Sequence, residues 1–62
     1  MNLKNVRKDK NLTQKELAAK LNLDQSTISK YEKNIILPNV MVLKKLAQVL
    51  DCTIDDLLKD TG

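Results

Sequence analysis

Apolar residues in this sequence recur three and four positions apart, which is the spacing of one face of a helix. Strand signals are lacking, because no stretch sustains an apolar-polar alternation and Tyr31 is the one aromatic residue. The only proline is Pro38, and the only glycine is the last residue. The pattern predicts an all-α fold, built as a single domain over residues 1–62.

Five short helices around one core are expected. Their predicted ranges are residues 2–9, 13–21, 25–33, 40–50 and 54–58, with a loop at 34–38 because Pro38 disfavours helix at the residue before it. The periodicity assigns a set of residues to the inner faces of these helices. In chain order they are Leu3, Val6, Leu17, Ala18, Leu21, Ile28, Tyr31, Val40, Leu43, Leu46, Ala47, Leu50, Ile54, Leu57 and Leu58.

Helix starts are marked by N-capping residues. Thr13 and Glu16 have the spacing of a capping box, in which each side chain bonds the backbone amide of the other residue. Thr53 and Asp56 repeat this arrangement before the last helix. Two further N-caps are expected, before the third and fourth helices: Asp24 and Asn39.

Charge is unevenly distributed along the chain. Residues 1–34 carry eight Lys or Arg and four Asp or Glu, a net charge of +4, whereas residues 35–62 carry three Lys and four Asp, a net charge of −1. A basic first half suits a polyanionic partner such as nucleic acid. The alternative is that these lysines are ordinary solvated surface residues.

Several classes of site and protein are excluded or disfavoured by composition. The single cysteine, Cys52, leaves no intrachain disulfide and no cysteine-based zinc site, and the sequence has no histidine to act as a general base. Asp55, Asp56 and Asp60 resemble a carboxylate cluster, but capping explains Asp56 better than a metal does. Cys52 is expected to be a partly buried core residue. No metal, cofactor or small-molecule ligand, and no enzyme pocket, is expected in so small a chain.

No segment of the chain favours a membrane or an export pathway. The sequence has no apolar run near the ~20 residues that span a bilayer, and its first ten residues are too polar for a secretory signal. A soluble cytoplasmic protein is therefore expected.

Residues 14–33 (QKELAAKLNLDQSTISKYEK) combine two predicted helices with a short connection. Ala18 supplies the small residue that two steeply crossing helices need at their closest approach. Asn22 lies at the turn, where a residue that tolerates positive φ is required. With Leu12-Thr13-Gln14 before the unit and Glu32 and Pro38 after it, the sequence resembles the Cro and phage-repressor helix-turn-helix family over about residues 3–58.

The resemblance implies a compact five-helix domain, like that of lambda repressor, with a helix-turn-helix made by the second and third helices. Arg7 and Glu32 match family positions that usually form an ion pair. The sequence departs from the family at Asn22 and Asn34, where glycine is frequent, but asparagine tolerates the same backbone conformation.

The resemblance also implies binding to double-stranded DNA, with the third helix in the major groove. Outward residues near the start of this helix would contact bases: Gln25, Ser26, Ser29 and Lys30. Residues at its edges and at the start of the second helix would contact phosphates: Gln14, Thr27, Lys33 and Asn34. The function expected is transcriptional regulation, by repression at a palindromic operator. The alternatives are a protein-interaction module on this fold, such as an antitoxin or adaptor, and, less favoured, an enzyme.

A homodimer is expected from the residues that follow the third helix. Ile35, Ile36 and Leu37 are consecutive apolar residues in a loop, which cannot all face the core of a small domain. Either Ile36 or Leu37 is expected to fold back over the core. The apolar residues left exposed, together with Met41 and Leu58, would form the contact between two copies.

Overall fold

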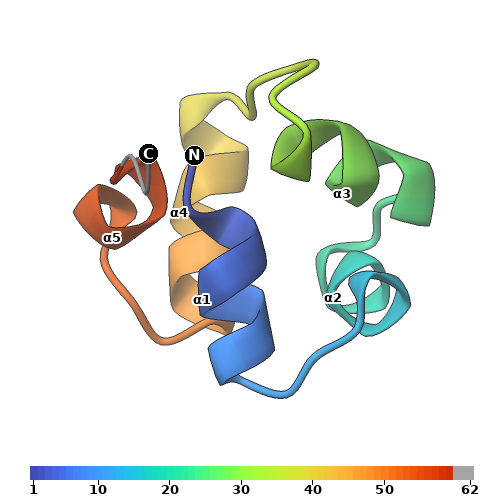
Figure 1. The fold of residues 1–62 in the computed structure, drawn as a ribbon, viewed down its shortest axis with the longest axis horizontal. Helices are drawn as coiled ribbons and strands as arrows, with labels where there is room; N and C mark the ends of the chain where they lie inside the picture. Colours follow the sequence, from blue (N-terminus) through green and yellow to red (C-terminus); the bar gives the residue numbers. More distant parts are fainter. Residues whose placement is uncertain (60–62) are drawn as a thin grey trace.

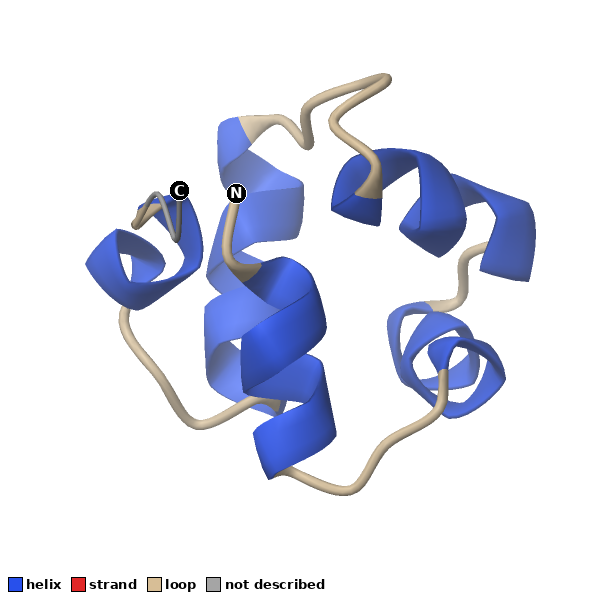
Figure 2. Cartoon of the chain, viewed as in Figure 1, coloured by secondary structure: helices blue, strands red, loops and turns tan. Residues whose placement is uncertain are grey.

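The computed structural model describes residues 1–59, and its regular elements are helices (Figure 1). They are α1 (Leu3–Asp9), α2 (Gln14–Leu21), α3 (Gln25–Glu32), α4 (Val40–Val49) and α5 (Ile54–Leu58). No strand is present in the described residues, as Figure 2 shows, so the all-α prediction is confirmed. The predicted boundaries counted four cap residues as helical: Asn2, Thr13, Lys33 and Leu50. Among the described helices, none has the length and apolar composition that crossing a bilayer requires.

α3 is held in place by two other helices. In Figure 1, α1 and α4 occupy the middle of the molecule, α5 lies on one side of them, and α2 and α3 lie on the other. α3 contacts α1 and α2; in addition, α2 contacts α4, α1 contacts α5, and α4 contacts α5. The loop from α3 to α4 runs along the upper edge of this view. One side of α3 is therefore supported by the domain, and the opposite side is exposed.

Every helix contributes to one hydrophobic core. The buried residues are Leu3, Leu17, Ala18, Leu21, Ile28, Tyr31, Leu46, Leu50 and Leu57, all of them predicted to face inward. Val6, Leu43 and Ala47 are partly buried against this core. Each fully buried leucine or isoleucine contributes about 1.5–3 kcal/mol to stability, so the core sets the positions of all five helices.

Two residues assigned to the inner faces are exposed instead. Val40 is 62% exposed and Leu58 is 53% exposed. Val40 lies six positions before the buried Leu46, and at 3.6 residues per turn this places it about 120° away around α4. Leu58 follows the buried Leu57 directly and is turned by about 100° from it. Both predictions of burial were wrong because these residues lie off the axis of the stripe that contacts the core.

The predicted caps are present with one difference. Thr13 and Glu16 form a capping box at the start of α2, and Thr53 and Asp56 form another at the start of α5. At α4, the Oδ1 atom of Asn39 accepts from the backbone amide of Val42 at 2.9 Å. Asp24 occupies the N-cap position of α3, but its side chain makes no capping bond. The Asp24 carbonyl oxygen instead accepts from the Thr27 amide at 3.0 Å.

Non-glycine residues with positive φ follow the first four helices. They are Asn11, Asn22, Asn34 and Asp51, with φ between 51° and 59°. The prediction for Asn22 is confirmed, since it is the left-handed C-cap of α2. Asparagine and aspartate adopt this conformation more readily than other non-glycine residues, which lets these helices end without glycine.

Candidate nucleic-acid interface

α2 and α3 are joined by a turn of three residues. The amide of Leu23 donates to the carbonyl of Ala18 at 2.8 Å, and the amide of Asn22 donates to Ala19 at 3.2 Å. These bonds satisfy the last carbonyls of α2 while Asn22, with φ of 57°, turns the chain toward α3. Ala18 is buried and lies one turn before the end of α2, as expected for a small residue near a helix crossing. The two helices therefore form a helix-turn-helix unit.

α3 has one buried and one exposed face. Ile28 and Tyr31 are buried in the core. On the rest of the helix and at its C-cap, Gln25, Ser26, Lys30 and Lys33 are exposed, whereas Thr27 and Ser29 are half-buried. Three of the four residues predicted to contact bases are thus freely accessible, and Ser29 is partly covered by its neighbours. The accessible side chains are polar or positive, which suits hydrogen bonding to base edges and phosphates.

Glu32, the last residue of α3, is bound by the guanidinium of Arg7 in α1. Arg7 Nε donates to Glu32 Oε2 at 2.6 Å, and Arg7 Nη2 donates to Glu32 Oε1 at 3.2 Å. Arg7 Nη1 also donates to the carbonyl of Leu12 at 2.6 Å. Only 9% of the Arg7 side chain and 4% of the Glu32 side chain are exposed. The ion pair that the family resemblance implies is present, and it ties α1 to the end of α3.

The protonation of Glu32 reflects this environment. Burial alone would raise the pKa of its carboxyl group, but hydrogen bonds from Arg7 and Gln14, and the charges of Arg7 and Lys4, outweigh burial and hold the pKa below its ordinary value. Lys4 is one turn before Arg7 on α1 and is exposed. The sequence prediction missed Lys4, and its position i−3 from Arg7 was the signal that could have placed it beside Glu32.

Two of the residues predicted to contact phosphates make bonds within the domain. Gln14, at the start of α2, donates from Nε2 to Glu32 Oε1 at 3.0 Å. Asn34, in the left-handed conformation after α3, accepts at Oδ1 from the Met1 amino group at 3.0 Å. Each amide keeps at least one further N–H group for another acceptor. Gln14 and the end of α3 are therefore brought together, a relationship that the sequence prediction did not contain.

Five large apolar residues are exposed between the end of α3 and the first turn of α4. We call them the apolar surface: Ile35, Ile36, Leu37, Val40 and Met41. The expectation that Ile36 or Leu37 folds over the core was wrong, since they are 42% and 73% exposed. Pro38 is the buried residue of this loop, and the chain can be anchored through it because a proline has no backbone N–H group to leave unsatisfied. Leu58, also predicted in the dimer contact, is exposed on α5.

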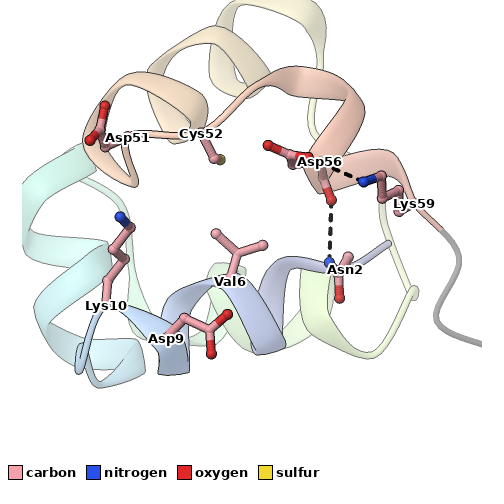
Figure 3. Close-up of a pocket in the computed structure, with 8 residues that line it drawn as sticks. All are labelled: Asn2, Val6, Asp9, Lys10, Asp51, Cys52, Asp56 and Lys59. Atoms are coloured by element: carbon pink, nitrogen blue, oxygen red, sulfur yellow. Dashed lines mark hydrogen bonds and ion pairs between the residues drawn. The ribbon is translucent and has the colours of Figure 1, made fainter.

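A shallow cavity of about 330 Å³ lies between the start of the chain and α5 (Figure 3). The expectation that so small a domain has no room for a pocket was therefore wrong. Its lining is mostly polar or charged: Asn2, Val6, Asp9, Lys10, Asp51, Cys52, Asp56 and Lys59. Burial, and the nearby charges of Asp56 and Asp51, raise the pKa of the Cys52 thiol, so the thiol is less reactive than an exposed one.

One carboxylate of this cavity, that of Asp56, belongs to a helix cap. The Asp56 carboxylate accepts from the Thr53 amide at 3.1 Å as part of the capping box. Within the part of the chain that the structure describes, no group of three or more potential metal ligands comes together. Asp60, the remaining member of the predicted carboxylate cluster, lies outside the described residues.

Comparison with known proteins agrees with this geometry. A sequence model described as "Helix-turn-helix" matches residues 3–57, which include all five helices apart from the last residue of α5. The chain belongs to the helix-turn-helix family of the Cro and phage-repressor type. This family consists of DNA-binding regulators and is not a class of enzymes.

Two members of the family with assigned names are similar to this chain. The HTH-type transcriptional activator BcrR of Enterococcus faecalis is 41% identical over 56 residues, which are 90% of this chain and 28% of that protein. The uncharacterized HTH-type transcriptional regulator YqaE of Bacillus subtilis is 38% identical over 58 residues, which are 94% of this chain and 50% of that protein. The chain thus spans half or less of the length of these relatives, and the similarity falls on the helix-turn-helix domain.

Proposed function

We propose that this chain binds double-stranded DNA in a sequence-specific manner, through α3 in the major groove, and regulates transcription in the cytoplasm. The observation that carries the proposal is the division of α3 into two faces. Ile28 and Tyr31 fix one face in the core, and Glu32 is fixed by Arg7. The other face presents polar side chains on a rigid helix, as a base-reading element requires.

The residues of this face suit particular roles. Gln25, the first residue of α3, has an amide that can bond N6 and N7 of adenine together, and Lys30 can donate to guanine. Ser26 and Ser29 are short, so the helix can approach the base edges closely. Phosphate contacts would come from the ends of α2 and α3: Gln14, Thr27, Lys33 and Asn34.

We propose a homodimer at a palindromic operator, and the size of the domain supports it. Its longest dimension is 25 Å, whereas successive major grooves on one side of DNA are about 34 Å apart. One copy therefore reads about one half-site, which rarely suffices for specificity. The apolar surface offers an isologous contact, and no charged residue lies between Ile35 and Leu43 to oppose the approach of a second copy. Leu58 on α5 would extend this contact.

The sign of regulation that we propose is repression, by a bound dimer that blocks access of other proteins to the operator. The relative from Enterococcus faecalis is named an activator. A promoter reporter carrying the bound site therefore decides the sign: repression predicts lower expression when the protein is present, and higher expression would contradict it.

Selection of bound sites from random DNA, followed by a salt titration, tests the proposed function. We expect enrichment of a two-fold symmetric sequence. The logarithm of the affinity should fall linearly with the logarithm of the salt concentration, with a slope of about 0.9 for each phosphate contacted. Lys33→Ala should lower this slope by about one unit, and Lys45→Ala, an equal charge change on the exposed side of α4, should leave it unchanged. A protein-interaction module would give neither enrichment nor a salt slope.

A further inference from the structure

The carboxylate of Glu32 accepts hydrogen bonds from two residues to which the proposed function gives separate roles: the guanidinium of Arg7 and the side-chain amide of Gln14. We infer that Glu32 is a positioning residue for DNA binding: it holds the Gln14 side chain at the start of α2 so that the second N–H of its amide is directed at a DNA phosphate. This inference rests on the proposed function and adds a role for Glu32 beyond structural pairing.

The geometry of the amide supports this role. Gln14 Nε2 donates one N–H to Glu32 Oε1 at 3.0 Å. The two N–H bonds of a primary amide diverge by about 120°, so when one is directed at the buried carboxylate the other is directed away from it. Glu32 is almost fully buried, whereas Gln14 is half-buried. The amide therefore spans the boundary between the protein interior and the surface at the N-terminus of α2, where helix amides favour an anion.

The pairing with Arg7 makes this arrangement compatible with a phosphate. A free carboxylate beside Gln14 would repel the DNA backbone. Here the guanidinium of Arg7 occupies both oxygens of Glu32, and Lys4 adds a further positive charge nearby. An approaching phosphate therefore meets a neutralised pair together with a donor that is already oriented.

Orientation before binding is the physical advantage. A glutamine side chain has several rotatable bonds, and fixing them at the moment of binding reduces affinity. The bond to Glu32 fixes them in the free protein. It also ties the start of α2 to the end of α3, so the phosphate contact and the base-reading helix keep a constant separation.

A double-mutant cycle on DNA affinity tests the inference. Gln14→Ala is measured on one selected duplex in the wild type and in an Arg7→Met, Glu32→Leu background, in which an apolar pair replaces the ion pair. In the wild type, we expect Gln14→Ala to weaken DNA affinity about tenfold, which is the size of a hydrogen bond to a charged group. In the Arg7→Met, Glu32→Leu background, we expect the same substitution to weaken affinity by less than about twofold. Equal losses in both backgrounds, or a larger loss in the Arg7→Met, Glu32→Leu background, would overturn the inference.

Lys33→Ala is the control, because it removes a proposed phosphate contact that Glu32 does not hold. Its effect on affinity should be the same in both backgrounds. If it shrinks together with that of Gln14→Ala, Glu32 acts only by shaping the whole interface and the positioning role is wrong. If the wild type binds DNA but the effect of Gln14→Ala is the same in both backgrounds, this inference is rejected and the proposed function is not. If the wild type does not bind DNA, both are rejected.

NMR of the wild type provides a measurement that does not depend on a folded variant. The two Gln14 side-chain amide protons should behave differently. The proton held by Glu32 should shift as Glu32 titrates, and it should keep its shift when duplex is added, while the other proton moves. Loss of the Glu32-bonded signal on adding duplex would mean that Gln14 leaves Glu32 to reach the phosphate, which would contradict the inference.

Discussion

Arg7 Nε lies 2.6 Å from Glu32 Oε2, and this contact joins the middle of α1 to the last residue of α3. Both side chains are almost fully buried, so neither charge has water as a substitute partner. The orientation of the proposed DNA-reading helix thus depends on a pair whose members are 25 positions apart in the sequence.

Removal of Arg7 should destabilise the domain strongly. Arg7→Ala leaves the Glu32 carboxylate buried and uncompensated, which should lower the free energy of unfolding by about 3–5 kcal/mol. In a domain of this size that is enough to unfold it at room temperature. Urea denaturation measures the effect, and Lys8→Ala, an exposed neighbour on α1, should change stability by less than about 0.5 kcal/mol. An unmoved urea midpoint for Arg7→Ala would contradict a stabilising pair.

The ion pair should make stability depend on pH in the acid range. The pKa of Glu32 in the folded protein lies below its ordinary value of 4.5, so the unfolded state binds the proton more readily. The contribution of Glu32 is therefore fully present above the ordinary value and is lost as pH falls through the lowered one. The difference in unfolding free energy between wild type and Glu32→Gln should shrink over this range. A constant difference from neutral to strongly acidic pH would show that Glu32 does not titrate as described.

The left-handed turn at Asn22 should discriminate among small residues. Asn22→Ala keeps a Cβ atom in the left-handed conformation but loses the local hydrogen bonding that helps asparagine adopt it, and should cost about 1 kcal/mol of stability. Asn22→Gly at the same position removes the steric conflict and should be neutral or stabilising. Thermal melts of the two variants make the comparison. An alanine variant as stable as the glycine variant would be inconsistent with a strained turn.

The apolar surface should mediate self-association. Ile35→Lys combined with Met41→Lys places charges where two copies would meet, so the variant should sediment as a monomer at concentrations where the wild type dimerises. Gln48→Lys, an exposed position toward the other end of α4, should still dimerise. If wild type and the double variant are the same monomer at high micromolar concentration, and bind a palindromic site equally well, the proposed dimer is wrong.

Much of the fold could be predicted because its signals are local. Capping boxes and helical periodicity each lie within one or two turns of the chain, and they placed all five helices. The left-handed Asn22 followed from its place in a short turn. Asn11 and Asp51 were missed, since a single asparagine or aspartate in a polar stretch gives no sign of its φ value until the end of the helix is known.

The parts that could not be predicted depend on contacts distant in sequence. Whether Ile36, Leu37 or Pro38 covers the core depends on the path that closes the loop from α3 to α4, which periodicity does not describe. The bond from Gln14 to Glu32 spans 18 positions and depends on side-chain directions at the ends of two helices. The pair of Arg7 and Glu32 was foreseen through the family resemblance, not through spacing.

The central claim, that α3 reads base edges, is tested most directly by Gln25→Ala. Affinity is measured for the selected operator and for random duplex at one salt concentration, beside the wild type and Lys33→Ala. We predict that Gln25→Ala weakens operator binding by about 1–3 kcal/mol and leaves random binding nearly unchanged, whereas Lys33→Ala weakens both. Equal losses of Gln25→Ala on operator and random DNA would show that this residue does not read a base.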